Sequence, residues 1–171
     1  MTRAARERGF TLIELMIVVA IVGLLSTVGI PVYKRATIRT RVAERATLMQ
    51  AMRTGIEDAY SRGVVPAGGL FGAANPAGAL GPSKRVFQNG ALGWRDINIL
   101  VQGNTYYRYQ FGALEAAGNV PAIYWVMAEG DIDGDGVPTQ KQFVGQRITG
   151  HWTVNEWPAA GEEDEFTFGS F

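Results

Sequence analysis

The feature of this chain that most constrains its fold is a long apolar segment near the start, which contains a single carboxylate. Between positions 10 and 32 the only charged residue is Glu14. As an α-helix this segment would be about 35 Å long, and the hydrocarbon core of a bilayer is roughly 30 Å thick. A charge costs on the order of 2.5–3.5 kcal/mol at the centre of a membrane helix, and less toward an end. The segment therefore predicts a membrane-spanning helix in which Glu14 needs a partner for its charge.

A positive partner for this carboxylate would arise if the chain were cut directly before Phe10. The new α-amine would then lie roughly 6 Å along the helix axis from Glu14, at about 1.5 Å per residue. The preceding residues 1–9 form a short basic leader that ends in Gly9. An ordinary secretory signal also has a basic start and an apolar core, but no small-residue cleavage site follows the apolar segment here. The leader is therefore not that of a typical secreted protein.

The N-terminal sequence resembles that of type IV prepilins and the related pseudopilins over roughly residues 7–34. Gly9, Phe10, Glu14 and Pro31 fall on the four positions that characterise the family. In this family a dedicated peptidase removes the leader after the glycine, and the new N-terminal residue is N-methylated. The resemblance implies cleavage between Gly9 and Phe10, methylation of Phe10, and assembly through Phe10, Glu14 and Pro31. It also implies that the leader faces the cytoplasm.

The segment that follows, residues 33–62, is predicted to continue the helix in amphipathic form. Its apolar residues recur at helical spacing, and Arg53 interrupts their row. The apolar residues of this row are Val42, Ala46, Met49, Ile56 and Tyr60. A cation and then a glycine, Arg62 and Gly63, favour the end of the helix there. Because proline and glycine weaken a helix, we expect a kink or a melted stretch near residues 23–31.

Residues 63–171 are predicted to form a globular head. Gly, Ala or Pro occupies fourteen of the twenty-one positions from 63 to 83, so residues 63–85 are expected to be a loop. Residues 86–171 favour an antiparallel sheet of about three to four strands, with apolar stretches at 107–111, 122–128, 143–148 and 152–154. The apolar face of this sheet would cover the amphipathic helix, which gives an α+β fold on an N-terminal membrane and assembly helix.

A candidate metal loop follows the second of these strands. Asp131, Asp133 and Asp135 stand at alternate positions and are followed by glycine. Calcium takes six to eight oxygen ligands, and in a loop of this kind Val137 would add a backbone carbonyl and Thr139 a side chain. A true EF-hand is not expected, because its final glutamate is missing and strands flank the loop. The loop is similar to one that holds calcium in some pseudopilins; a polar hairpin favoured by its Asp-Gly pairs is the alternative.

The composition offers no catalytic site. The chain has no cysteine and few serines, and its only histidine, His151, stands beside a tryptophan near a predicted strand, where a structural role is expected. No nucleophile–base pair is indicated, so we expect a protein that is not an enzyme and requires no cofactor apart from the candidate calcium ion. The five aromatic residues Tyr106, Tyr107, Tyr109, Trp125 and Trp152 could form a surface that binds carbohydrate or nucleic acid. Aromatic residues on strands are, however, expected to lie in the core.

The charges are unevenly distributed although the formal net charge is zero. Residues 34–62 hold seven basic and three acidic residues, whereas residues 115–171 hold two basic and ten acidic ones. A basic helix and an acidic head suggest complementary surfaces between like subunits, and two solvated faces that never meet are the alternative. Contact of the basic helix with nucleic acid stays open.

Together, these features predict a structural subunit, a major or a minor pilin, of a type IV pilus-like filament. The resemblance implies processing by prepilin peptidase and assembly with other pilin subunits by inner-membrane machinery. The precursor would cross the inner membrane once with its head in the periplasm, and the mature subunit would lie in a filament at the cell surface. Two alternatives remain: a type II secretion pseudopilin in a periplasmic pseudopilus, and a monomeric membrane-anchored module that binds calcium or another ligand.

Overall fold

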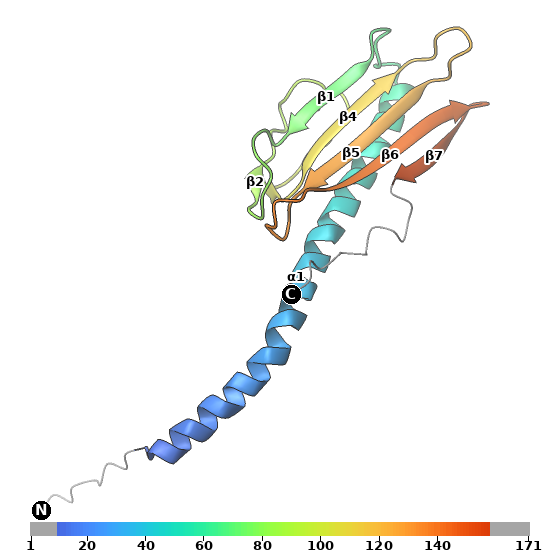
Figure 1. The fold of residues 1–171 in the computed structure, drawn as a ribbon. Coiled ribbons are helices and arrows are strands. Elements are labelled where there is room, and N and C mark those ends of the chain that lie inside the picture. Colours follow the sequence, from blue (N-terminus) through green and yellow to red (C-terminus); the bar gives the residue numbers. More distant parts are fainter. Residues whose placement is uncertain (1–9, 158–171) are drawn as a thin grey trace, which may run out of the picture. The chain divides into compact units, whose positions relative to one another are not determined.

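The computed structural model describes residues 10–157, which form one long helix and seven strands (Figure 1). The chain divides into two units between Thr40 and Arg41. The elements of the described part are α1 (Leu12–Ser61), β1 (Leu70–Asn75), β2 (Arg85–Val86), β3 (Asn104–Thr105), β4 (Arg108–Leu114), β5 (Ile123–Gly130), β6 (Thr139–Ile148) and β7 (His151–Trp157).

The N-terminal unit contains the apolar half of α1. Its large apolar side chains are exposed along the whole segment from Phe10, which is 81% exposed, to Tyr33, which is 74% exposed. Within the described residues, α1 is long and apolar enough to cross a membrane, by its length and composition. The helix runs through Pro31 without a break, so the expected melted stretch is absent from residues 12–61. One missing backbone donor removes a single intrahelical bond, and the turns on either side keep theirs.

The C-terminal unit begins with the second half of α1, whose end follows the sequence prediction. Gly63 has a φ of 65°, in the left-handed region that glycine adopts at helix ends. Its N–H donates to the carbonyl of Tyr60 at 3.1 Å, and the N–H of Val64 donates to that of Ala59 at 3.1 Å. These two bonds are those of a Schellman motif, and they satisfy carbonyls that the helix leaves free.

The head contains a five-stranded antiparallel sheet in the order β1-β4-β5-β6-β7. The α+β class is confirmed, and the sheet has more strands than expected. Four strands coincide with the predicted apolar stretches, whereas β1 lies inside residues 63–85. The expectation of a loop there was wrong for residues 70–75, which pair with β4. A second, two-stranded sheet joins β2 to β3.

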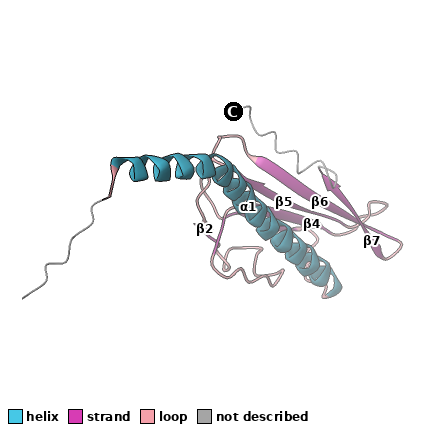
Figure 2. Cartoon of the chain, turned by 90° about the horizontal axis from the view of Figure 1, so that it is seen from below, coloured by secondary structure: helices cyan, strands magenta, loops and turns pink. Residues whose placement is uncertain are grey.

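One face of the large sheet packs on residues 41–61 of α1 (Figure 2). The helix contributes a row of buried apolar side chains: Met49, Met52, Ile56, Ala59 and Tyr60. The facing strands contribute Tyr109, Phe111, Ala113, Tyr124, Val126, Ala128 and Phe143. Ala46, which the sequence placed in this row, is exposed. The buried row is therefore turned slightly around the helix from the predicted one.

Most of the aromatic residues considered for a binding platform belong to this core. Tyr107 and Tyr109 are fully buried. Trp152 packs on Tyr60 and on Tyr124, with ring centroids 4.8 Å and 4.9 Å apart. The expected core role is confirmed for these residues, but Trp125 lies on the other face of the sheet.

Candidate functional site

The start of α1 is organised by a reciprocal pair, Thr11 and Glu14. Glu14 Oε2 accepts hydrogen bonds from the Thr11 backbone N–H at 3.0 Å and from the Thr11 hydroxyl at 2.8 Å. In return, the Glu14 N–H donates to Thr11 Oγ1 at 3.3 Å. This geometry is a capping box, which satisfies two of the N–H groups that a helix leaves unpaired at its start. Glu14 therefore stabilises its own helix as well as carrying a charge.

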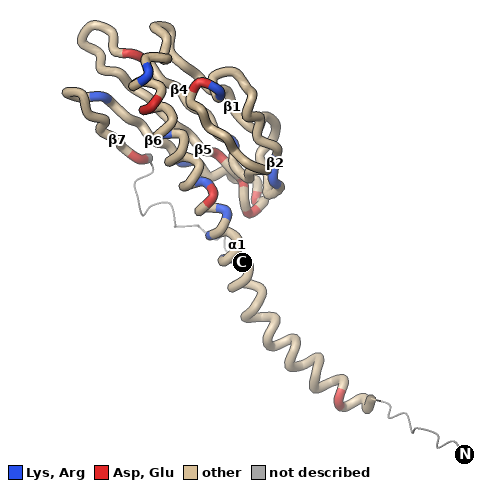
Figure 3. Tube along the Cα trace, turned by 180° about the vertical axis from the view of Figure 1, so that it is seen from behind, with Lys and Arg blue, Asp and Glu red and all other residues tan. Residues whose placement is uncertain are grey.

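Only one oxygen of this carboxylate is used by the cap. Both bonds from Thr11 end on Oε2, and within residues 10–157 no hydrogen bond reaches Oε1. Glu14 is exposed, and the side chains around it on the first turns are apolar. Figure 3 shows this single acidic position at the start of a helix that is otherwise uncharged over its first turns. The free oxygen is available to a cation supplied from outside the helix.

The other residues predicted for this site lie around the same segment. Phe10 lies two residues before the start of the helix and is 81% exposed. Pro31 lies in the interior of α1, and Gly9 lies outside the described residues. The structure thus brings Glu14 and Thr11 together. Thr11 was missed by the sequence reasoning, although a Thr three residues before a Glu at the start of an apolar helix is the signature of a capping box.

The candidate metal loop connects β5 to β6. Asp131, Asp133 and Asp135 each offer a carboxylate oxygen, and these three oxygens lie within 4.8 Å of one another. Asp131 is buried, and its two oxygens accept the N–H groups of Gly134 at 2.8 Å and Gly136 at 3.3 Å. The other two carboxylates are exposed. The predicted carboxylates therefore converge, with Asp131 fixing the turn.

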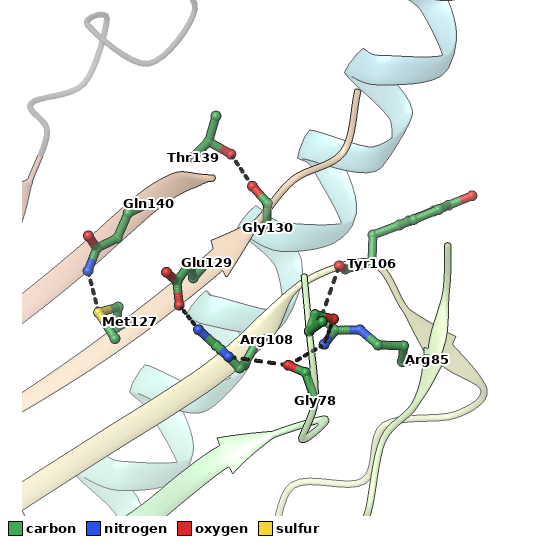
Figure 4. Close-up of polar contacts among 10 residues, drawn as sticks. Gly78, Arg85, Tyr106, Arg108, Met127, Glu129, Gly130, Thr139 and Gln140 are labelled. Atoms are coloured by element: carbon green, nitrogen blue, oxygen red, sulfur yellow. Dashed lines mark hydrogen bonds and ion pairs between the residues drawn. The ribbon is translucent and has the colours of Figure 1, made fainter. Parts of the chain in front are cut away.

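The remaining predicted ligands border this cluster. The N–H of Val137 donates to Asp135 Oδ1 at 2.7 Å. The Thr139 hydroxyl donates to the carbonyl of Gly130 at 3.0 Å and closes the base of the loop (Figure 4). On the helix side, the Arg41 guanidinium donates to the carbonyl of Ile132. The loop is thus held at its base and at its side.

A family model described as the prokaryotic N-terminal methylation motif matches residues 4–30. The type IV major pilin protein PilE1 of Neisseria gonorrhoeae is 42% identical over 72 residues, which are 42% of this chain and 34% of the relative. A fimbrial protein of Pseudomonas aeruginosa is 47% identical over 57 residues, or 33% and 37% of the two chains. A fimbrial protein of Neisseria meningitidis serogroup B is 44% identical over 54 residues, 32% of each chain.

An exposed apolar helix that carries a methylation motif, together with an α+β head, is the arrangement of a pilin-like protein. In its N-terminal motif and over the matched residues, the chain is similar to type IV pilins and fimbrial proteins. The chain spans about a third of the length of the curated relatives it matches. No solved structure matches the chain.

Proposed function

We propose that this chain is a structural subunit of a type IV pilus-like filament. Its leader would be removed between Gly9 and Phe10 by prepilin peptidase, and Phe10 would then be N-methylated. The relatives are a major pilin and fimbrial proteins, which supports a structural rather than an enzymatic role. The membrane would hold the subunit before assembly, with the head in the periplasm, and the filament would hold it afterwards at the cell surface.

The observation that carries this proposal is that both hydrogen bonds to the Glu14 carboxylate end on one of its two oxygens. Its Oε2 caps the helix, whereas its Oε1 accepts no hydrogen bond from the described residues, and the exposed side chains of the neighbouring turns are apolar. The Phe10 amine of a neighbouring subunit is a cation of the right size for that oxygen. Such a contact neutralises two charges that a membrane or a helical bundle would otherwise leave unpaired. Because one geometry satisfies both groups, it also fixes the axial register between neighbours.

The first prediction separates the cap from the charge. Glu14→Gln keeps an acceptor for the Thr11 N–H, since a capping box accepts either Glu or Gln, but it removes the charge. We expect Glu14→Gln and Glu14→Val to be inserted and processed normally, and both to be lost from sheared surface fibres by at least tenfold in immunoblots. Thr11→Val, which weakens the cap and keeps the charge, should still enter fibres. Normal assembly of Glu14→Gln would contradict the pairing.

Processing and location distinguish this function from its alternatives. Mass spectrometry of the membrane-extracted protein should find N-methyl-Phe10 at the N-terminus, and only in cells that have the peptidase. A type II secretion pseudopilin would also be processed, but it would stay with the cell when surface fibres are sheared off. A simple membrane-anchored module would keep its leader.

We further propose that the β5–β6 loop binds a calcium ion through Asp131, Asp133 and Asp135, with Val137 and Thr139 as further oxygen donors. Three carboxylate oxygens within 4.8 Å of one another support this proposal. Without a cation, carboxylates this close repel one another, and oxygen-rich loops of this kind suit calcium. In a chain that lacks cysteine, an ion between two strands would also stabilise the head.

The second prediction follows from ligand linkage. At a free Ca²⁺ concentration about 100 times the Kd, binding adds about 2.7 kcal/mol to the stability of the head, which corresponds to roughly 5–10 °C in Tm. Differential scanning fluorimetry of the full chain, with Ca²⁺ and with EDTA, measures this difference. The double variant Asp133→Asn/Asp135→Asn should lose the rise, whereas Asp96→Asn, an exposed acid outside the loop, should keep it. An equal rise in the double variant would mean that calcium binds elsewhere.

A further inference from the structure

The large sheet has a second face, opposite α1, which among the described residues is contacted at one end by the loop after β1, where Arg108 donates to the carbonyl of Gly78. Its side chains follow from the strand register, in which Phe71 pairs with Gly112, Gly112 with Trp125, and Trp125 with Val144. Seven apolar side chains lie on this outer face: Phe71, Leu114, Ile123, Trp125, Met127, Val144 and Ile148. Phe71 is 50% exposed and Leu114 42%. The outer face is therefore an apolar surface within the part of the chain that the structure describes.

The centre of the outer face is an aromatic floor over Gly112. A Cβ placed on Gly112 would lie 2.6 Å from Trp125 Nε1 and 2.8 Å from its Cε2. The same Cβ would lie 3.0 Å from Cδ1 of Phe71. Both rings thus occupy the space that a side chain at this position would fill, and the indole lies against the backbone of the neighbouring strand. Trp125 is half-buried in this position, and Phe71 is 50% exposed.

Hydrogen-bonding groups surround this floor without being used by the fold. The side-chain amides of Gln110, Gln142 and Gln146 lie on the outer face beside Trp125 and Val144 in the register. No hydrogen bond within residues 10–157 engages these amides or the Trp125 indole N–H. Among the glutamines of this face, Gln140 has a side-chain contact, with the sulfur of Met127 (Figure 4). An amide both donates and accepts, as a sugar hydroxyl does, so each amide can match a hydroxyl in either orientation.

The charges of the outer face point to a neutral ligand. Its charged strand residues are Arg108 and Glu129, which pair with each other at one end of the face (Figure 4). A nucleic acid or an anionic lipid needs unpaired cations, which this face does not offer. An apolar aromatic floor with uncharged amides instead matches a ligand that has apolar C–H faces and hydroxyl edges.

We propose that the outer face is a binding site for neutral oligosaccharides. The C–H face of a pyranose ring stacks on Trp125 and Phe71, and its hydroxyls bond to the amides of Gln110, Gln142 and Gln146. All of these groups belong to one sheet, so the site is complete in a single head. The site does not depend on filament assembly, although a filament would repeat it many times and raise its avidity.

The test uses the full chain in phosphatidylcholine nanodiscs, because a maltoside detergent would itself present sugars to the site. The probes are cellohexaose, chitohexaose and maltohexaose, with a heparin hexasaccharide as the charged comparison. Isothermal titration calorimetry and tryptophan fluorescence should detect binding of at least one neutral probe below millimolar concentration. Trp125→Ala should weaken this binding about tenfold or more, and Gln142→Ala about threefold. Leu92→Ala, which removes a 91% exposed side chain outside the sheet, should leave binding unchanged.

Circular dichroism of each variant shows whether the head still folds; if Trp125→Ala does not fold, Phe71→Ala at the edge of the sheet replaces it. Loss of binding in a folded variant supports the site. The proposal is overturned if no neutral probe binds, if the folded variants bind as well as the unchanged chain, or if the heparin hexasaccharide binds more tightly. It is also overturned if analytical ultracentrifugation shows a dimer that Trp125→Ala dissociates, since a second copy would then occupy the face.

Discussion

At the scale of single residues, Tyr60 fixes the end of α1 to the sheet. Its hydroxyl lies 2.7 Å from the carbonyl oxygen of Leu114 and 2.8 Å from that of Ile123. Its single proton can therefore be donated to a carbonyl of either strand. Burial raises the pKa of Tyr60 to about 12, and the nearby charge of Glu115 acts in the same direction. The neutral phenol is therefore favoured in the folded head.

The third prediction is a pH dependence that follows from this shift. An unfolded tyrosine ionises near pH 10, so the contribution of Tyr60 to stability is fully present below pH 10 and is lost as the pH rises toward about 12. Tyr60→Phe removes this contribution at every pH. Urea titrations of both chains should therefore give midpoints whose difference is constant below pH 10 and shrinks between pH 10 and 12. A difference that stays constant up to pH 12 would show that Tyr60 ionises as freely in the folded head as in the unfolded chain.

Which of these residues the sequence could reveal depends on how far away their partners are. The Thr11–Glu14 cap is local, because its two residues are one helical turn apart. Their spacing in the sequence is therefore sufficient to predict the cap. The contacts of Tyr60 cross to positions more than fifty residues away. No spacing along the chain indicates such a partner, so only its burial was predictable.

At the scale of elements, the sheet repeatedly pairs a glycine with an aromatic ring on the next strand. Gly72 faces Phe111, Gly112 faces Trp125, and Gly145 faces Tyr124 in the register. In each pair the ring fills the space of the missing side chain, since a Cβ would approach it to between 2.1 and 2.6 Å. Such pairs restore packing that glycine alone would lose from a strand.

This device explains why β1 was missed while the other strands of the large sheet were found. The stretch from Leu70 to Asn75 contains Gly72 and two alanines and no β-branched residue, so it has the composition of a loop. Its strand form depends on the Phe111 ring, which comes from β4. By contrast, β5 and β6 carry their own apolar or alternating pattern and are visible from their own residues.

The fourth prediction tests one of these pairs. A Cβ on Gly145 would lie 2.3 Å from two atoms of the Tyr124 ring. That ring cannot move freely, because its hydroxyl donates to Glu57 on α1 at 2.7 Å. Gly145→Ala should therefore destabilise the head by about 1–3 kcal/mol, as overpacked cores do, measured by urea unfolding. Gly68→Ala is the matched control, since nothing lies within 4 Å of its added methyl group, and equal stability of the two variants would argue against the clash.

At the scale of the whole molecule, the two units draw their stability from different sources. The head has its own core, built from Met49, Met52, Ile56 and the inner face of the sheet. The apolar half of α1 exposes its side chains, and its backbone is held in a helix most strongly where water is absent. The residues of α1 follow this division, because the first half of the helix is apolar on all sides and the buried side chains lie in its second half.

The fifth prediction is that the head and the apolar half of α1 unfold separately. When the full chain is heated in zwitterionic micelles, the near-ultraviolet circular dichroism of the head aromatics should disappear in one transition. Part of the helical signal at 222 nm should persist, because a helix in an apolar phase has no water to replace its backbone hydrogen bonds. Gly145→Ala should lower the temperature of the head transition and leave the residual helical signal unchanged. Gly23→Pro, placed in the exposed apolar half of α1, should reduce the residual signal without moving the head transition. If both signals vanish together in every variant, the helix and the head form one cooperative unit, and the membrane segment then owes its structure to the head.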